Sequence, residues 1–278
     1  MKWSIVTDSS CDLYPSLSAD GQIQVTSVPF VIRVGKQEFV DDERLDLPAM
    51  LDAMEQEPSA SQTACPSPQA WLARFQQADR VIALTISSQL SGSMNSALAA
   101  REIARSLDPK KQIAVLDSRS TGPELALCVE ELKEQIQKGL SFDAVVSHAM
   151  QFFQRTRIAF ALSSFNNLVK NGRISRLKGF VARKLGMWGI GIGSEQGTIQ
   201  VTGKTRGAAG AVDKLLAQMR ESGFCGGRVM ISHCQNAALA AMLKRKIQEQ
   251  WKNCEVGVLP TRGLCSYYAE RGGLIVSY

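Results

Sequence analysis

Hydroxyl side chains are concentrated in the segment Ser88-Gln89-Leu90-Ser91-Gly92-Ser93, which follows an apolar run ending at Ile86. This pattern predicts a buried strand that passes into a helix beginning near Ser91. The first N–H groups of a helix lack backbone partners and carry partial positive charge, so such a junction can bind an anion. A serine at this place is also a common helix cap. From this segment alone, the cap is the interpretation we favour.

A second group of hydroxyls, in Thr63-Ala64-Cys65-Pro66-Ser67, lies just before another predicted helix, which begins at Pro68. Hydroxyls on two such loops can hold a single carboxylate between them. Each charge-assisted hydrogen bond contributes about 1.5–3 kcal/mol, which is enough to orient a headgroup but too little for tight binding. Most of the affinity for such a ligand must therefore come from elsewhere.

The elements around these two segments are predicted to form a doubly wound α/β domain with a parallel sheet. Strands that alternate with helices along the chain predict that the strands pair in parallel. The expected strands are residues 3–7, 25–34, 80–86 and 112–116, and the expected helices are 48–55, one from 68, one from about 91, 122–138 and 142–154. Residues 61–65 are expected to form an extended loop.

The second half of the chain is predicted to be an α+β unit with a mixed sheet. Its turn-rich segment Ser194-Glu195-Gln196-Gly197 is typical of an antiparallel hairpin. The expected strands are 158–162, 188–193, 198–202, 229–232, 256–259 and 273–276, and the expected helices are 208–219 and 237–250. We therefore expect two domains, 1–155 and 156–278, in a chain of 278 residues. The cleft between them is the default place for a ligand.

The sequence also predicts the cellular location of the protein and argues against disulfide bonds and a zinc site. Asp8 comes too early for the apolar part of a signal peptide, and no run of eighteen apolar residues follows, so we expect a cytoplasmic protein without an integral membrane segment. Seven cysteines without any C-x-x-C pair argue against a disulfide framework and against zinc. Most of them are expected to be small buried hydrophobic residues.

The net charge of +6 favours acidic partners, because it attracts anions over long range. Glu195 is the one acidic residue in the stretch 170–206. Nucleic-acid binding through this stretch is therefore an alternative function, but its charges are not interleaved with stacking aromatic residues. The basic residues are Lys170, Arg173, Arg176, Lys178, Arg183, Lys184, Lys204 and Arg206.

Motifs distributed over nearly the whole chain resemble those of the DegV family, in the same order. Each motif is short, but the ordered set is specific. They are residues 5–13 (Ile-Val-Thr-Asp-Ser-Ser-Cys-Asp-Leu), Val28-Pro29 with Asp41-Asp42, residues 63–67, residues 87–93, Val115-Leu116-Asp117-Ser118 and Asn171-Gly172-Arg173-Ile174-Ser175.

The resemblance implies a protein that encloses one long-chain fatty acid between two domains and needs no other cofactor. By the same match, the hydroxyls of Thr63 and Ser91 hold the carboxylate, and the backbone N–H groups of Gly92 and Ser93 are plausible helpers. Members of this family present the fatty acid to a separate kinase, which uses ATP to make acyl-phosphate for phospholipid synthesis. Burying about fifteen methylenes contributes roughly 12 kcal/mol before ordering costs, so the tail supplies affinity.

Two arginines are additional candidates for the ligand site. Arg173 is expected either to steady the headgroup region or to face a partner protein. Many relatives carry a His-Thr-Gly-Pro-Gly-like segment near the carboxyl end, whereas this chain reads Leu259-Pro260-Thr261-Arg262-Gly263. Two interpretations of this difference are open: Arg262 replaces the absent histidine as a cation close to the headgroup, or the segment marks a subgroup whose hand-over to a kinase differs.

A serine-dependent acyl hydrolase that uses Ser91 is the main alternative from another functional class. The sequence around Ser91 is not G-x-S-x-G. A hydrolase needs a base within hydrogen-bond reach of its nucleophile, and the histidines of this chain are His148 and His233. We expect no catalytic residue and favour a lipid-binding protein over an enzyme.

Overall fold

The computed structural model describes residues 2–57, 61–174 and 186–278. The first half of the chain forms a five-stranded sheet in the order β2-β3-β1-β7-β8. Its pairs are parallel except that β2 runs antiparallel to β3. The strands are β1 (Trp3–Asp8), β2 (Ser16–Leu17), β3 (Ile23–Val28), β7 (Arg80–Thr85) and β8 (Gln112–Asp117).

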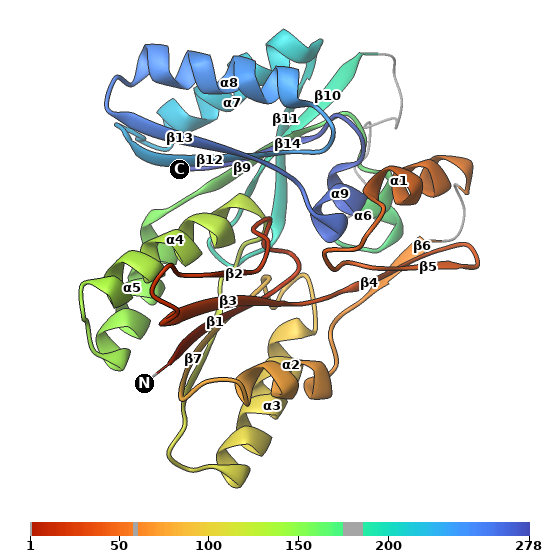
Figure 1. Cartoon of the computed structure of the whole chain (residues 1–278). Helices are drawn as coiled ribbons and strands as arrows, with labels where there is room; N and C mark the ends of the chain where they lie inside the picture. The colour runs from red at the N-terminus through yellow and green to blue at the C-terminus, as the bar shows by residue number, and fades with distance from the viewer. Residues whose placement is uncertain (1, 58–60, 175–185) are drawn as a thin grey trace.

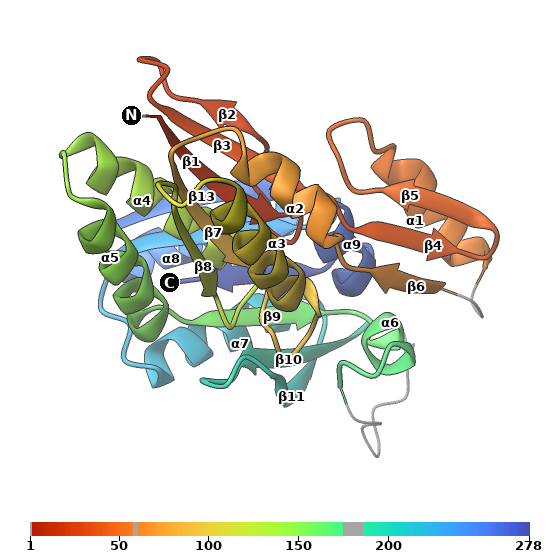
Figure 2. The same ribbon diagram turned by 90° about the horizontal axis from the view of Figure 1, so that it is seen from below.

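Helices cover both faces of this sheet. On the outer face, α2 (Pro68–Phe75) and α3 (Ser93–Leu107) bury Val6, Val81 and Ala83 (Figure 2). On the other face, α4 (Pro123–Gln137) and α5 (Phe142–Arg155) pack with Ile5 and Ile82. The predicted α/β architecture is therefore confirmed, and Ser67 caps α2 as its sequence suggests, accepting a hydrogen bond from Ala70 N.

The second half of the chain forms a six-stranded mixed sheet in the order β11-β10-β9-β14-β12-β13. Only the β12–β13 pair is parallel. Two helices, α7 (Ala208–Glu221) and α8 (Ala237–Gln250), cover its outer face (Figure 1). The strands are β9 (Ile158–Leu162), β10 (Met187–Gly193), β11 (Ile199–Arg206), β12 (Gly227–His233), β13 (Cys254–Pro260) and β14 (Leu274–Ser277).

The prediction of one strand from Val25 to Val34 is wrong. The chain leaves the first sheet after Val28, and β4 (Val31–Val34) joins a separate three-stranded sheet in the order β5-β4-β6. Pro29 stands at the break, where it cannot donate a ladder hydrogen bond. The residues expected as a loop include β6 (Ser61–Ala64), and β5 (Gln37–Val40) was not predicted.

Three further helices lie together on one side of the space between the two large sheets (Figure 1). The predicted helix near Pro48 is α1 (Leu47–Gln56), whereas α6 (Asn166–Lys170) and α9 (Gly263–Ala269) were not foreseen. The helix α4 contacts β3 of the first sheet and both β12 and β14 of the second. The division into domains at residue 155 stays a prediction, because α4 packs on both sheets.

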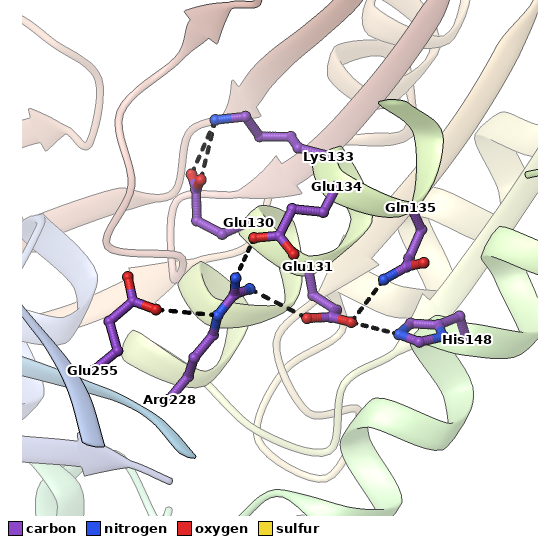
Figure 3. A network of polar contacts seen from close by, with 8 residues as sticks. All are labelled: Glu130, Glu131, Lys133, Glu134, Gln135, His148, Arg228 and Glu255. Atoms are coloured by element: carbon purple, nitrogen blue, oxygen red, sulfur yellow. Dashed lines mark hydrogen bonds and ion pairs between the residues drawn. The ribbon is translucent and has the colours of Figure 1, made fainter. Parts of the chain in front are cut away.

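A network of charged side chains also joins the two halves (Figure 3). Arg228 of β12 contacts Glu131 of α4 at 3.3 Å and Glu255 of β13 at 3.5 Å, and it pairs with Glu134 of α4. His148 of α5 lies 2.6 Å from the other oxygen of Glu131. The network therefore connects α4 and α5 to the edge of the six-stranded sheet.

None of the helices in the described residues has the length and apolar character needed to cross a bilayer. All seven cysteines lie in the described part and are free thiols. Burial is confirmed for the majority of them, namely Cys11, Cys128, Cys234 and Cys265.

Candidate functional site

An apolar cavity of about 190 Å³ lies where the carboxyl end of β7 faces the six-stranded sheet. One wall is β9, which contributes Ile158, Phe160 and Leu162. Further apolar residues come from β14, α9, α6 and the ends of β7 and β3; they are Ile275, Leu264, Ala269, Leu168, Ile86 and Phe30. This is the edge of a parallel sheet at which ligands of α/β proteins gather.

Hydroxyl groups line one end of the cavity. Thr63 of β6 and Ser91 in the loop before α3 both reach it, together with Gly92 and Tyr268. The Thr63 Oγ1 and Tyr268 Oη atoms are 3.0 Å apart and share a hydrogen bond. Among the described residues that line the cavity, none is acidic. The structure thus brings together Thr63, Ser91 and Gly92, three of the residues that the sequence analysis assigned to the site.

A buried aspartate fixes the backbone around Ser91. Asp8, at the end of β1, is completely buried and accepts hydrogen bonds from Ile86 N at 3.0 Å and Ser93 Oγ at 2.6 Å. Burial raises the pKa of Asp8, against the opposing effect of these donors. The carboxyl group therefore attaches the end of β7 and the start of α3 to β1.

Ser93 does not line the cavity, because its hydroxyl is bound to Asp8. Its backbone N–H donates to Ser91 Oγ at 3.3 Å. Gly92 occupies the N-cap position of α3 and lines the cavity. Of the two residues expected to assist from the sequence, Gly92 therefore lies at the cavity and Ser93 N–H is engaged by Ser91; their role in binding a ligand stays a prediction.

Arg173 lies at the same end of the cavity. Its Nε donates to the carbonyl of Leu90 at 2.8 Å, directly before Ser91, and its Nη1 donates to the carbonyl of Asn171. The Asn171 side chain in turn donates to Tyr267 Oη at 2.8 Å. Arg173 thus holds the loop directly before Ser91, and both roles expected for it stay predictions.

The prediction that Arg262 belongs to the ligand site is wrong, because Arg262 does not line the cavity. Its guanidinium donates to Leu13 O at 3.1 Å, Ser27 Oγ at 3.1 Å and Asp41 O at 2.9 Å, and the residue is only 2% exposed. The guanidinium thereby joins the end of β3 and the loops after β1 and β5 to the start of α9. Arg262 therefore does not replace the histidine at the headgroup.

The structure adds lining residues that the sequence analysis did not assign to the site. Tyr268 was missed because α9 was not predicted, and its seven residues give too short a pattern to recognise. Arg119 and Ser120 follow β8 and reach the cavity from the next loop of the sheet. Their position after a predicted strand was a usable signal, since ligands gather at such loops.

Neither histidine lines the cavity with Ser91. His148 is held by Glu131 between α4 and α5. His233 lies on β12, where Nδ1 accepts a hydrogen bond from Asn236 N at 3.2 Å and burial lowers its pKa. The described residues therefore provide no histidine base for a hydrolase that uses Ser91.

The basic stretch does not form one surface in the described part of the chain. Arg173 reaches the cavity, whereas Lys204 and Arg206 are exposed on the edge strand β11. Four of its members, Arg176, Lys178, Arg183 and Lys184, lie outside the described residues. The nucleic-acid alternative gains no support from this arrangement.

Comparison with known proteins assigns the chain to a family. The family model described as "Uncharacterised protein, DegV family" matches residues 2–278. A DegV domain-containing protein of Streptococcus pyogenes serotype M1 is 39% identical over 278 residues, which cover 100% of this chain and 99% of the relative.

Solved structures agree with this assignment. The Streptococcus pneumoniae Fatty Acid Kinase (Fak) B3 protein loaded with linoleic acid has a TM-score of 0.95 and 38% identity, covering 100% of this chain and 99% of its own. A DegV family protein from Eubacterium eligens loaded with heptadecanoic acid has a TM-score of 0.94 and 37% identity, covering 99% and 98%. The chain described here belongs to the DegV family.

Proposed function

We propose that this protein binds one long-chain fatty acid between its two large sheets and presents the carboxylate to a separate fatty acid kinase. The observation that carries the proposal is the cavity, which is apolar along β9 and has hydroxyls and Arg173 at one end. In this account, residues 1–155 and 156–278 are two domains that enclose the ligand. The solved relatives that carry linoleic and heptadecanoic acid support it.

The carboxylate is proposed to lie beside Thr63 and Ser91. Their hydroxyls donate to it, and the Gly92 N–H at the start of α3 offers a further donor with favourable dipole orientation. Arg173 contributes positive charge at this end of the cavity, where no described lining residue is acidic. The tail then extends along Leu162, Phe160 and Ile158 of β9.

The first experiment measures fatty acid binding to delipidated protein and its variants. Removing both hydroxyls in a Thr63→Ala/Ser91→Ala variant should weaken binding at least tenfold, because each charge-assisted hydrogen bond contributes about 1.5–3 kcal/mol. A Thr198→Ala variant is the matched control, since this hydroxyl lines the cavity at the β10–β11 turn. Equal affinity of the double variant and the wild type would contradict the proposed headgroup site.

A second experiment tests delivery to a kinase. The name of the similar Fatty Acid Kinase (Fak) B3 protein supports such a partner. Purified kinase from the same organism should form acyl-phosphate from ATP only when loaded protein is present, and Ser91→Ala should lower the rate. Because this reaction uses ATP, we propose that it occurs in the cytoplasm. Kinase activity on free fatty acid that is unaffected by this protein would refute the delivery role.

A further inference from the structure

A second concave space adjoins the cavity. It is a groove of about 900 Å³ formed by β8, α5, the start of β9 and the β10–β11 hairpin. Arg119, Ile158 and Gly193 line both the cavity and the groove. At the other end of β9, Leu162 lies close to Ala269, next to Tyr268. The shared residues therefore form a partition at the end of the cavity remote from Thr63 and Tyr268.

Close packing between neighbouring strands builds this partition. A Cβ atom on Gly193 would lie 2.6 Å from Ile158 Cγ2, so the absence of a side chain on β10 is what lets Ile158 take its position. Two residue pairs along, Gly191 of β10 is the register partner of Phe160, and a Cβ there would collide with the phenyl ring. The glycines of β10 thus admit the large side chains of β9.

The hairpin turn beside the partition is attached to the first sheet. Ser87 Oγ donates to the carbonyl of Gly197 at 2.7 Å, and Arg119 Nη1 donates to the carbonyl of Glu195 at 3.4 Å. Gly197 has φ +85°, and its Cα faces Ser87 and Arg119 too closely for a side chain. The turn is therefore held against the loops after β7 and β8.

The two sides of the partition differ in polarity. The cavity is lined by apolar residues of β9, β14 and α9. The groove has apolar lining residues as well, among them Leu116, Met150 and Phe153. It differs from the cavity because it also presents many amide and charged side chains, namely Gln154, Gln196, Gln200, Gln218, Arg157 and Glu195. An acyl tail therefore gains less from each methylene in the groove than from each methylene that it buries in the cavity.

We infer that the partition of Ile158 against Gly193 sets the longest acyl chain that the protein accepts. This inference rests on the proposed function. Each buried methylene raises affinity about fourfold, so affinity should increase with chain length until the methyl end reaches Ile158. A longer chain must displace Ile158 or enter the groove of mixed polarity, and each further methylene then adds less affinity.

The test exploits two substitutions with opposite effects. Delipidated protein is loaded from an equimolar mixture of saturated fatty acids of 12 to about 22 carbons, and the bound species are identified by mass spectrometry. Ile158→Ala should shift the bound acids to longer chains by roughly two methylenes, because it removes three carbon atoms at the partition. Gly193→Ala should shift them to shorter chains, since the new methyl pushes Ile158 into the cavity.

Ile190→Ala is the matched control, because Ile190 is buried on the opposite face of β10 against the α7 side of the sheet. It should leave the length distribution unchanged. If Ile158→Ala does not fold, Ile158→Val serves in its place, with a smaller shift in the same direction. A folded, loaded Ile158 variant with the wild-type distribution would overturn the inference. Wild-type protein that takes up no fatty acid of any length would instead refute the proposed function.

Discussion

Two adjacent tyrosines on α9 have different tasks. Tyr268 lines the cavity and shares a hydrogen bond with Thr63. Tyr267 is fully buried, donates to Ser61 Oγ at 2.7 Å and accepts from Asn171. One hydroxyl therefore belongs to the ligand site and the other joins α9 to β6 and α6.

This difference predicts separable effects of removing each hydroxyl. Tyr268→Phe should weaken fatty acid binding about three- to tenfold, the worth of one neutral hydrogen bond of about 1 kcal/mol. Tyr267→Phe should leave affinity unchanged and lower the free energy of unfolding, since it removes two hydrogen bonds, to the half-buried Ser61 and Asn171. Affinity comes from titration calorimetry and stability from urea unfolding. A Tyr268→Phe protein that binds like the wild type would contradict this assignment.

The candidate site could be predicted from the sequence only where the residues lie in contiguous motifs. Thr63 and Ser91 are in such motifs, each before a helix. The role of Arg262 could not be predicted, because its partners Leu13, Ser27 and Asp41 are more than 200 residues away along the chain. A buried structural arginine and a ligand-binding arginine look alike in a sequence.

At the scale of elements, α9 is fixed by two buried carboxyl groups. Asp41 accepts hydrogen bonds from the N–H groups of Gly263 and Leu264, each at 2.8 Å. Asp12, in the loop after β1, accepts one from Arg262 N at 2.9 Å. Burial raises the pKa of Asp12 from 3.8 to about 6, despite the opposing hydrogen bonds. The contact of α9 with the first sheet therefore depends on a carboxyl group whose charged form is destabilised by burial.

The raised pKa of Asp12 predicts a pH-dependent stability. The Asp12 carboxyl group binds a proton more tightly in the folded protein than in the unfolded chain. Its contribution to the free energy of unfolding is therefore most favourable below pH 4, and this contribution is lost as pH rises through about 6. The difference corresponds to about 3 kcal/mol. Asp12→Asn should therefore become more stable relative to the wild type between pH 4 and 7, as measured by urea unfolding at each pH. A stability difference that does not change with pH would contradict this.

Elements with a strong local pattern were predictable, and elements defined by distant contacts were not. The strand at 158–162 and the helix at 237–250 match β9 and α8. Val25 to Val34 was misread because Pro29, which marks the break between β3 and β4, was not given weight. That the two halves join different sheets depends on contacts with residues distant in the chain. The strand β5 has only exposed and half-buried residues, so its sequence lacks the pattern of a core strand.

At the scale of the whole molecule, the network around Arg228 joins α4 to the six-stranded sheet (Figure 3). The Arg228 side chain is 40% exposed and that of Glu131 is 18% exposed. Solvent therefore screens much of the attraction, and the pairs are worth little individually.

Replacing this arginine should have a modest, salt-sensitive effect. Arg228→Met should lower the free energy of unfolding by about 1 kcal/mol in low salt and by less in 1 M salt. Arg245→Met is the control, because Arg245 and Glu249 form an exposed pair at 3.8 Å on α8, and its effect should be within a few tenths of a kcal/mol. A loss of equal size for both variants, measured by urea unfolding, would contradict a specific role for the network.

The central claim is that a fatty acid occupies the cavity between the sheets. Native mass spectrometry of freshly purified protein, followed by extraction and identification of the released lipid, tests it most directly. The account predicts one long-chain fatty acid per chain, with lower occupancy in the Thr63→Ala/Ser91→Ala variant. Protein that carries no lipid after purification and takes up no added fatty acid would contradict it.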